Sequence, residues 1–187
     1  MLEAWSGLLA LSSMFVKHGG ELVGAIEWTV ELLELVGWLH PKAFKTDDFY
    51  KMEWKGWQQL IGNVDVITGG FACVTLSRAG KQLMEKDVRS AQLMDTVGMA
   101  VYFEARAVLL ENVVELVDKD NIHGMLTEAK QFMMNEGFML VSIWRQNHAR
   151  CGGASQRQRV LPLWVRAEVA MVVAPSGAPS ASSSPCP

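Results

Sequence analysis

The chain has 187 residues, half of them hydrophobic and a fifth charged, with a formal net charge of −3. This profile is typical of a single globular domain with a hydrophobic core. No apolar run reaches the roughly 18 residues of a membrane helix. The N-terminus also lacks a secretory signal pattern. Three scattered cysteines exclude a disulfide framework and a CxxC zinc site, so we expect an intracellular protein without a bound metal and without a membrane partner.

The acidic charge balance also bears on nucleic-acid binding. A protein that binds DNA by itself usually presents a basic surface, because phosphate contacts supply much of the affinity. This chain has 17 basic and 20 acidic residues. Either DNA is not its partner, or the basic DNA-binding part lies elsewhere.

Short apolar runs alternate along the chain with segments of helical spacing. Gly137 follows the last of these helical segments as a glycine stop. The final segment, 174–187, reads APSGAPSASSSPCP, which offers nothing to bury, so we predict that it is disordered and take the whole tail as 169–187. The predicted strands are 22–27, 63–68, 107–110, 138–144 and 160–165, and the predicted helices are 28–39, 90–103 and 123–135.

This alternation predicts an α/β fold, with a mostly parallel sheet and helices on both of its faces. In such folds ligands bind at the carboxyl ends of the strands, near the point where the strand order reverses. Residues that directly follow predicted strands are therefore candidates for chemistry. They are Glu27, Cys73 and Glu111.

Cys73 follows a strand and a glycine pair in the segment Gly69-Gly70-Phe71-Ala72-Cys73. A loop cysteine at this edge of a sheet can be partly exposed, and nearby cations would lower the pKa of its thiol and make it nucleophilic. The alternative is a buried structural cysteine, which is the common state of a free thiol.

The surrounding motifs favour the nucleophile. GGFAC followed by SRAGKQ at 77–82 resembles the catalytic loop of the DNA (cytosine-5)-methyltransferases, which reads GGFPCQxFSxAGKQ. Asp87-Val88-Arg89-Ser90 resembles the DxRS segment of that family, and Glu111-Asn112-Val113 its ENV motif, again directly after a strand. Gly152 and the run Arg157-Gln158-Arg159-Val160 match the end of its GxPQxRxRV segment.

The N-terminal part resembles the cofactor half of the same family. The run 3–7, EAWSG, is similar to the DLFSG opening. Ile26-Glu27-Trp28 is similar to the second motif, and Asp47-Asp48-Phe49 to a third, GDI-like turn. These motifs occur in the family's order up to about residue 166. The resemblance implies a Rossmann-like methyltransferase fold with a seven-stranded sheet over 1–168, divided into a cofactor half at about 1–62 and a catalytic half at about 63–168.

The resemblance implies a covalent mechanism that uses S-adenosylmethionine. Cys73 attacks C6 of a cytosine that has left the DNA duplex. Glu111 binds the base edge and shares a proton at N3, which requires a raised carboxyl pKa. C5 then takes the methyl group. Arg157 and Arg159 orient the base and the acids through charge-assisted hydrogen bonds.

The implied cofactor contacts also have simpler alternatives. Glu27 accepts hydrogen bonds from ribose hydroxyls, Trp5 and Trp28 enclose the adenine, and Asp48 accepts from its amino group. Glu27 could instead serve the dipole of the following helix, and each tryptophan could be part of the core. The complete implied cofactor set is Trp5, Ser6, Gly7, Glu27, Trp28, Asp48, Phe49 and Gly70, and the implied substrate set is Ser77, Arg78, Lys81, Gln82 and Asn112.

Besides smaller changes at Glu3 and Ser155, where the family has aspartate and glutamine, the chain departs from the family pattern in three ways that bear on function. Ala72 and Val74 flank Cys73 where the family has proline and glutamine. Leu8, Leu9 and Ala10 stand where glycines let the backbone approach the cofactor. The third departure is an absence: the target-recognition region and the family's last motif have no counterpart here, so a partner chain that supplies this region is a possible partner alongside DNA.

These departures leave three functions open. The first is methylation of cytosine C5 in DNA. The second is a degenerate or truncated relative that acts as a cofactor-binding or regulatory module. The third is a tRNA cytosine-5 methyltransferase, which uses the same chemistry. The location implied by a DNA substrate is nuclear in a eukaryote and cytoplasmic in a bacterium.

Overall fold

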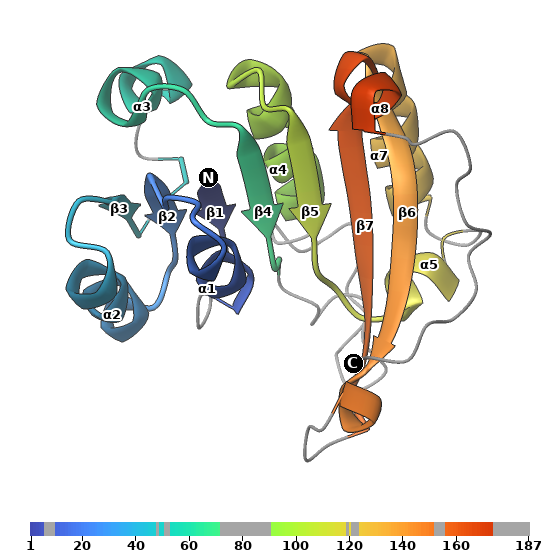
Figure 1. Ribbon diagram of the computed structural model, residues 1–187, viewed down its shortest axis with the longest axis horizontal. Coiled ribbons are helices and arrows are strands. Elements are labelled where there is room, and N and C mark those ends of the chain that lie inside the picture. The colour runs from blue at the N-terminus through green and yellow to red at the C-terminus, as the bar shows by residue number, and fades with distance from the viewer. Residues whose placement is uncertain are drawn as a thin grey trace.

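The computed structural model of the chain describes residues 1–5, 10–47, 49–50, 53–71, 91–118, 120, 124–151 and 156–173. Its centre is a seven-stranded sheet with the order β3-β2-β1-β4-β5-β7-β6, accompanied by helices (Figure 1). The strands are β1 (Leu2–Ala4), β2 (Gly24–Ile26), β3 (Phe44–Thr46), β4 (Val66–Gly69), β5 (Ala107–Leu110), β6 (Phe138–Asn147) and β7 (Gln158–Arg166). The helices are α1 (Ala10–Lys17), α2 (Val30–Leu39), α3 (Trp54–Ile61), α4 (Gln92–Tyr102), α5 (Glu115–Asp118), α7 (Met125–Asn135) and α8 (Ala167–Val173).

The sheet confirms the predicted α/β class. Strands β1 to β5 run parallel, whereas β7 pairs antiparallel with both β5 and β6. The sheet is therefore mixed, with its two antiparallel pairs at one end. The strand order reverses between β1 and β4, because the chain proceeds outward from β1 to β3 and then returns to β4.

Right-handed crossovers place the helices on opposite faces of the sheet. The connections through α1 and α2 run in one direction along the sheet, and the connection through α4 runs in the other. Figure 1 accordingly shows α4 and α7 behind β5 and β6, with α1 in front of β1. Helix α4 packs on β4 and β5 and also touches α7.

Alternating side chains divide the core into two clusters. On β2, Ala25 belongs to a smaller cluster with Leu22 and Val36, and Ile26 belongs to the larger one. Successive side chains of a strand point to opposite faces, so one apolar run serves both layers. The fully buried Trp164 on β7 belongs to the larger cluster, on the side of α4 and α7.

Local signals explain the limits of α7. The Asp120 carboxylate accepts hydrogen bonds from the backbone N–H groups of Leu126 and Thr127, at 2.9 and 3.0 Å. These groups would otherwise have no partner within the helix. Gly137 has a φ of +80°, a left-handed conformation that glycine adopts readily. Its predicted role as the stop of this helix is confirmed.

The structure also differs from the sequence-based expectation. Strands β1 and β3 have three residues each, too short for a pattern of their own, and helices α1 and α3 were not predicted. Helix α8 extends to Val173, so the tail boundary at residue 169 is wrong for 169–173. The rest of the predicted tail lies outside the described residues.

Candidate active site at the carboxyl ends of the strands

The parallel strands end at a common level. Ala4 on β1 pairs with Ile26 on β2 and with Gly69 on β4, and Gly69 pairs with Leu110 on β5. The next residues are Trp5, Glu27, Gly70 and Glu111, so four predicted site residues from distant parts of the sequence meet at one edge of the sheet. This edge includes the reversal point between β1 and β4, where α/β sheets bind ligands.

Gly70 lies between the cofactor side and the catalytic side of this edge. Its backbone N–H donates to the carbonyl oxygen of Ala4 at 3.3 Å. A Cβ on Gly70 would lie 3.5 Å from the carbonyl oxygen of Trp5 and 3.7 Å from Oε2 of Glu111. The missing side chain therefore leaves a small space between the end of β1 and the Glu111 carboxylate.

Glu111 is held at the end of β5. Its backbone N–H donates to the carbonyl oxygen of Gly69 at 2.8 Å. Its Oε1 forms an ion pair with Nε of Arg159 at 2.5 Å, with side chains that are 32% and 17% exposed respectively. The carboxylate is thus largely shielded, and a guanidinium from β7 holds one of its oxygens.

The electrostatics of Glu111 reflect a balance between burial and charge. Burial raises the pKa of the Glu111 carboxyl, and the positive charge of Arg157 partly opposes that rise. The contact with Arg159 also favours the charged form. The predicted trio of Glu111, Arg157 and Arg159 is therefore brought together, and a carboxyl with a raised pKa can hold a proton and donate it.

The side chain of Asn112, predicted to contact the substrate, is instead bonded to backbone groups of the chain. It is buried, and its Nδ2 donates to the carbonyl oxygen of Phe71 at 3.0 Å, while its Oδ1 accepts from the N–H of Val113 at 2.8 Å. Its backbone also bonds in both directions with Val160 on β7. Asn112 therefore ties the segment that leads toward Cys73 to β5 and β7.

Glu27 lies where the sequence predicted an acid, directly after β2. It is buried, and its Oε1 accepts the backbone N–H of Thr29 at 3.0 Å. Thr29 immediately precedes α2. The carboxylate is thus fixed at the start of α2. This position is compatible both with an interaction with the helix dipole and with binding of ribose hydroxyls.

The aromatic residues of the cofactor half pack against one another and leave no gap between parallel rings for an adenine. The rings of Trp5 and Trp28 are 5.9 Å apart at an interplanar angle of 80°. A base stacks between two rings only when they are parallel and separated, so these two do not form the expected adenine sandwich. Trp5 and Phe49 are buried with ring centroids 5.4 Å apart, whereas Trp28 is half exposed.

Two residues of this region were missed by the sequence reasoning. Glu3 on β1 is buried, its carboxylate accepts the N–H of Ser12 on α1 at 3.2 Å, and burial raises its pKa to about 7. Thr96 on α4 accepts the indole N–H of Trp5 at 3.0 Å. The DLFSG-like run marked the position of Glu3 but gave no sign of its burial, and nothing in the local sequence indicated Thr96.

Several predicted site residues lie outside the described residues, and they remain predictions. They are Ser6, Gly7, Asp48, Cys73, Ser77, Arg78, Lys81 and Gln82.

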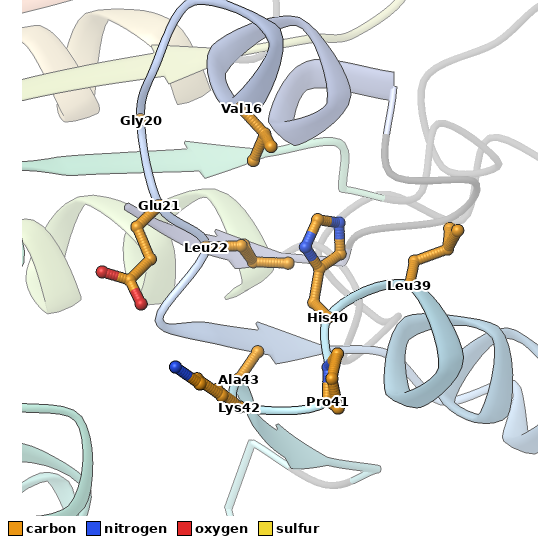
Figure 2. A pocket seen from close by; sticks show the side chains of 9 residues that line it. All are labelled: Val16, Gly20, Glu21, Leu22, Leu39, His40, Pro41, Lys42 and Ala43. Carbon is orange, nitrogen blue, oxygen red and sulfur yellow. The ribbon is translucent and has the colours of Figure 1, made fainter.

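A pocket of about 290 Å³ opens on the opposite edge of the sheet. It lies before the starts of β2 and β3, and its lining comes from the end of α1 and from the segments that lead into these two strands, including Val16, Leu22 and His40 (Figure 2). Ligands of such sheets bind at the carboxyl ends of the strands, so this pocket is not part of the candidate site.

In the part of the chain that the structure describes, no three His, Cys, Asp or Glu side chains gather as a metal site would require. No helix among the described residues is long and apolar enough to span a membrane.

Solved structures that share this fold have little sequence identity with the chain. A protein described as a DNA modification methyltransferase, encoded within a prophage of E. coli, matches with a TM-score of 0.71 at 16% identity, over 90% of this chain and 47% of that one. A Spodoptera frugiperda DNMT2 mutant matches with 0.67 at 18% identity, over 90% and 50%. The S. pombe Dnmt2 methyltransferase matches with 0.64 at 16% identity, over 89% and 48%. At these identities the likeness shows the fold.

The sequence comparisons are more specific. The type II methyltransferase M.PspPI of Psychrobacter sp. (strain TA137) is 38% identical over 61 residues, which are 33% of this chain and 15% of that protein. The chain thus spans about half the length of the solved structures and a small part of this relative. The model of the C-5 cytosine-specific DNA methylases matches residues 1–182. This match covers nearly the whole chain, which therefore belongs to the C-5 cytosine-specific DNA methylase family.

Proposed function

We propose that this chain is the catalytic part of an enzyme that transfers a methyl group from S-adenosylmethionine to C5 of cytosine in DNA, with Cys73 as the nucleophile. The observation that carries this proposal is the shielded Glu111–Arg159 ion pair beside Gly70, at the carboxyl ends of β4 and β5 and the start of the antiparallel β7. It supplies an acid of raised pKa at the position that the ENV motif assigns to the base-binding glutamate.

The edge of the sheet has the chemistry to hold S-adenosylmethionine. The space above Gly70, which a Cβ would fill, suits a ligand that approaches the backbone closely. Glu27 supplies a carboxylate for ribose hydroxyls, Asp48 an acceptor for the adenine amino group, and Trp28 a half-exposed ring. When bound, S-adenosylmethionine would supply the methyl group from its sulfonium sulfur and leave as the neutral thioether S-adenosylhomocysteine.

On the catalytic side, each residue has a defined task. The Cys73 thiolate forms a bond to C6 of the cytosine, and the electron pair of the C5–C6 double bond moves toward C5 while Glu111 provides a proton at N3. C5 gains the methyl group and then gives up its own proton to a base. The S–C6 bond breaks, which restores the thiolate and the double bond, and N3 returns its proton to Glu111.

The remaining residues hold this arrangement. Arg159 keeps one oxygen of Glu111 occupied, so that the other can face the base. Arg157 carries a second positive charge next to the carboxylate. Asn112 holds the carbonyl of Phe71, two residues before Cys73, against the end of β5. We assign the contacts with the nucleic-acid backbone to Ser77, Arg78, Lys81 and Gln82.

Two nucleic acids, DNA and tRNA, are candidate substrates of the proposed reaction. The solved structures share the fold at 16–18% identity, which does not distinguish substrates. tRNA is therefore the alternative substrate. The net charge of −3 suggests weak DNA binding by the chain alone. We infer that target recognition requires a region or a partner chain beyond this one, within the cell compartment that contains the nucleic acid.

The test is a methyl-transfer assay with isotopically labelled S-adenosylmethionine and two substrates at equal concentration, unmethylated duplex DNA and unmodified tRNA. The products are digested to nucleosides and analysed by mass spectrometry. We expect labelled 5-methylcytosine from the DNA. Label only in tRNA would support the alternative substrate, and label in neither, although S-adenosylmethionine binds, would support the non-catalytic module.

A further inference from the structure

The backbone of Trp5 adopts an unfavourable conformation at the end of β1. Its φ is +57°, in the left-handed region. Glycine and asparagine adopt this region readily, whereas a bulky residue such as tryptophan rarely does. Such a conformation persists only where surrounding contacts hold it. Because the Trp5 carbonyl oxygen borders the space above Gly70, this conformation determines part of the shape of the candidate cofactor site.

Thr96 on α4 provides the contact that anchors Trp5. Its hydroxyl donates to the carbonyl oxygen of Gln92 at 2.7 Å, and this leaves its lone pairs to accept the indole N–H of Trp5 at 3.0 Å. Thr96 is fully buried and Trp5 is 7% exposed. A hydrogen bond at such a site is held firmly, because water cannot replace either partner.

The methyl group of Thr96 makes a second contact with the same edge of the sheet. A Cβ on Gly69 would lie 3.0 Å from Cγ2 of Thr96, which shows how closely the threonine packs on the end of β4. Thr96 therefore touches the ends of both β1 and β4, the two strands between which the strand order reverses.

The indole N–H of Trp5 is also a particular feature of this chain. The segment EAWSG resembles DLFSG, in which phenylalanine stands at the position of Trp5. Phenylalanine has no donor, whereas a buried tryptophan needs a partner for its N–H. The hydroxyl of Thr96 provides that partner.

We propose that Thr96 is a positioning residue for the S-adenosylmethionine site, acting through Trp5 to hold the end of β1 in its left-handed conformation beside Gly70. The inference rests on the proposed function, since it assumes that S-adenosylmethionine binds at this edge. Thr96 itself need not touch the cofactor.

The test compares three substitutions in the full chain. Thr96→Val removes the acceptor but keeps a methyl group and the buried volume. Thr96→Ser keeps the acceptor and removes the methyl group. Trp5→Phe removes the donor and keeps a ring. For each, S-adenosylmethionine affinity is measured by calorimetry, and the Trp5 indole N–H resonance and its hydrogen exchange are followed by NMR in the free protein, with circular dichroism to confirm folding.

We expect Thr96→Val to weaken S-adenosylmethionine binding about tenfold, equivalent to about 1.4 kcal/mol, and to expose the Trp5 indole N–H to exchange. Thr96→Ser should retain the protected indole N–H and most of the affinity. In the Trp5→Phe background, Thr96→Val should have little further effect, because the hydrogen bond is already absent.

Three outcomes would overturn the inference. One is unchanged affinity in Thr96→Val, and another is an equal loss from Thr96→Val with and without Trp5→Phe. Both would leave the proposed function standing. The third is an unaltered chain that does not bind S-adenosylmethionine at all, which would contradict the proposed function and remove the inference with it.

Discussion

At the scale of single residues, two carboxyl groups of this domain are shielded from solvent for different reasons. Glu111 faces the reaction edge and is paired with Arg159. Glu3 lies within β1 and accepts the N–H of Ser12 near the start of α1. Burial raises the pKa of both carboxyls. Under the proposed function the first shift would serve chemistry, whereas the second affects stability, so the two can be tested separately.

Glu111→Gln should remove activity without unfolding the domain. Glutamine can still accept from Arg159, but it cannot give up and regain a proton at N3. We expect the rate of methyl transfer to fall by about 10² to 10⁴, with little change in the midpoint of thermal unfolding. The exposed Glu128→Gln on α7 is the control and should leave the rate unchanged. Full activity in Glu111→Gln would contradict the assigned role.

Glu3→Gln should change how stability depends on pH. The pKa of Glu3 is about 7 in the folded chain, above the usual 4.5, so the folded state binds this proton more tightly. The stability that this group contributes is fully present below about pH 4.5 and is lost as the pH rises through about 7, with an upper limit of about 3 kcal/mol. Glutamine mimics the neutral form and should remove this loss.

The measurement for Glu3 is urea unfolding of both proteins at about pH 5 and about pH 8. The original chain should lose more stability between the two conditions than Glu3→Gln does. Glu34→Gln, at an exposed position on α2, serves as the control and should behave like the original chain. Equal pH dependence in Glu3→Gln and the original chain would show that Glu3 is not the titrating group.

At the scale of elements, the end of β4 carries two adjacent glycines with different tasks. A Cβ on Gly69 would come within 3.0 Å of Thr96 and 3.4 Å of Leu110, whereas a Cβ on Gly70 would make only ordinary contacts, at 3.5 Å or more. The first glycine allows α4 to pack on the sheet. The second leaves the space beside Glu111 open.

Gly69→Ala should therefore affect mainly the stability of the fold, and Gly70→Ala mainly the binding of S-adenosylmethionine. Gly69→Ala should reduce the free energy of unfolding by about 1–3 kcal/mol through overpacking. Gly70→Ala should fold with nearly unchanged stability but bind S-adenosylmethionine more weakly. Chemical denaturation and calorimetry on both variants check this. A stable Gly69→Ala, or a Gly70→Ala that binds normally, would contradict the respective assignment.

The elements also show what the sequence could and could not predict. Strand β5 and Glu111 were predictable, because a short apolar run leads directly into the ENV motif. Strands β1 and β3 were not, because three residues carry no periodicity. Contacts between distant segments left no local signal. Thr96 lies 91 residues from Trp5, and Asn112 lies 41 residues from Phe71, so the anchoring of Trp5 and the backbone role of Asn112 required the folded chain.

At the scale of the whole molecule, one side of the sheet ends in a long edge strand. Among the described strands, the ten-residue β6 pairs with β7 alone. Met139, Val141 and Trp144 on this strand are about half exposed. A long apolar edge strand promotes pairing between molecules, so this edge is where the isolated chain should self-associate.

Val141→Lys should reduce this self-association. A charged residue on an edge strand disfavours pairing between sheets. Light scattering over a concentration series should show fewer oligomers than for the original chain. Gln146→Lys, which adds the same charge at another exposed position of β6, should have a smaller effect. Identical scattering from the original chain and Val141→Lys would locate the self-association elsewhere.

The whole molecule also determines how the proposed activity is best examined. The chain spans 47–50% of the solved structures that share its fold, so a single chemical event is a better test of the proposal than repeated turnover on a specific DNA target. A single chemical event at Cys73 depends only on the site described here and on the segment that carries the cysteine. It is therefore the more direct measure of catalytic competence.

The decisive measurement is covalent trapping on DNA that contains 5-fluorocytosine, with S-adenosylmethionine and a high DNA concentration, analysed by denaturing gel and mass spectrometry. Fluorine at C5 prevents the final elimination, so the cysteine stays bonded to the methylated base. We predict an adduct at Cys73 that is absent in Cys73→Ser and strongly reduced in Glu111→Gln. No adduct from a folded chain that binds S-adenosylmethionine would contradict the proposal that this chain is a catalyst.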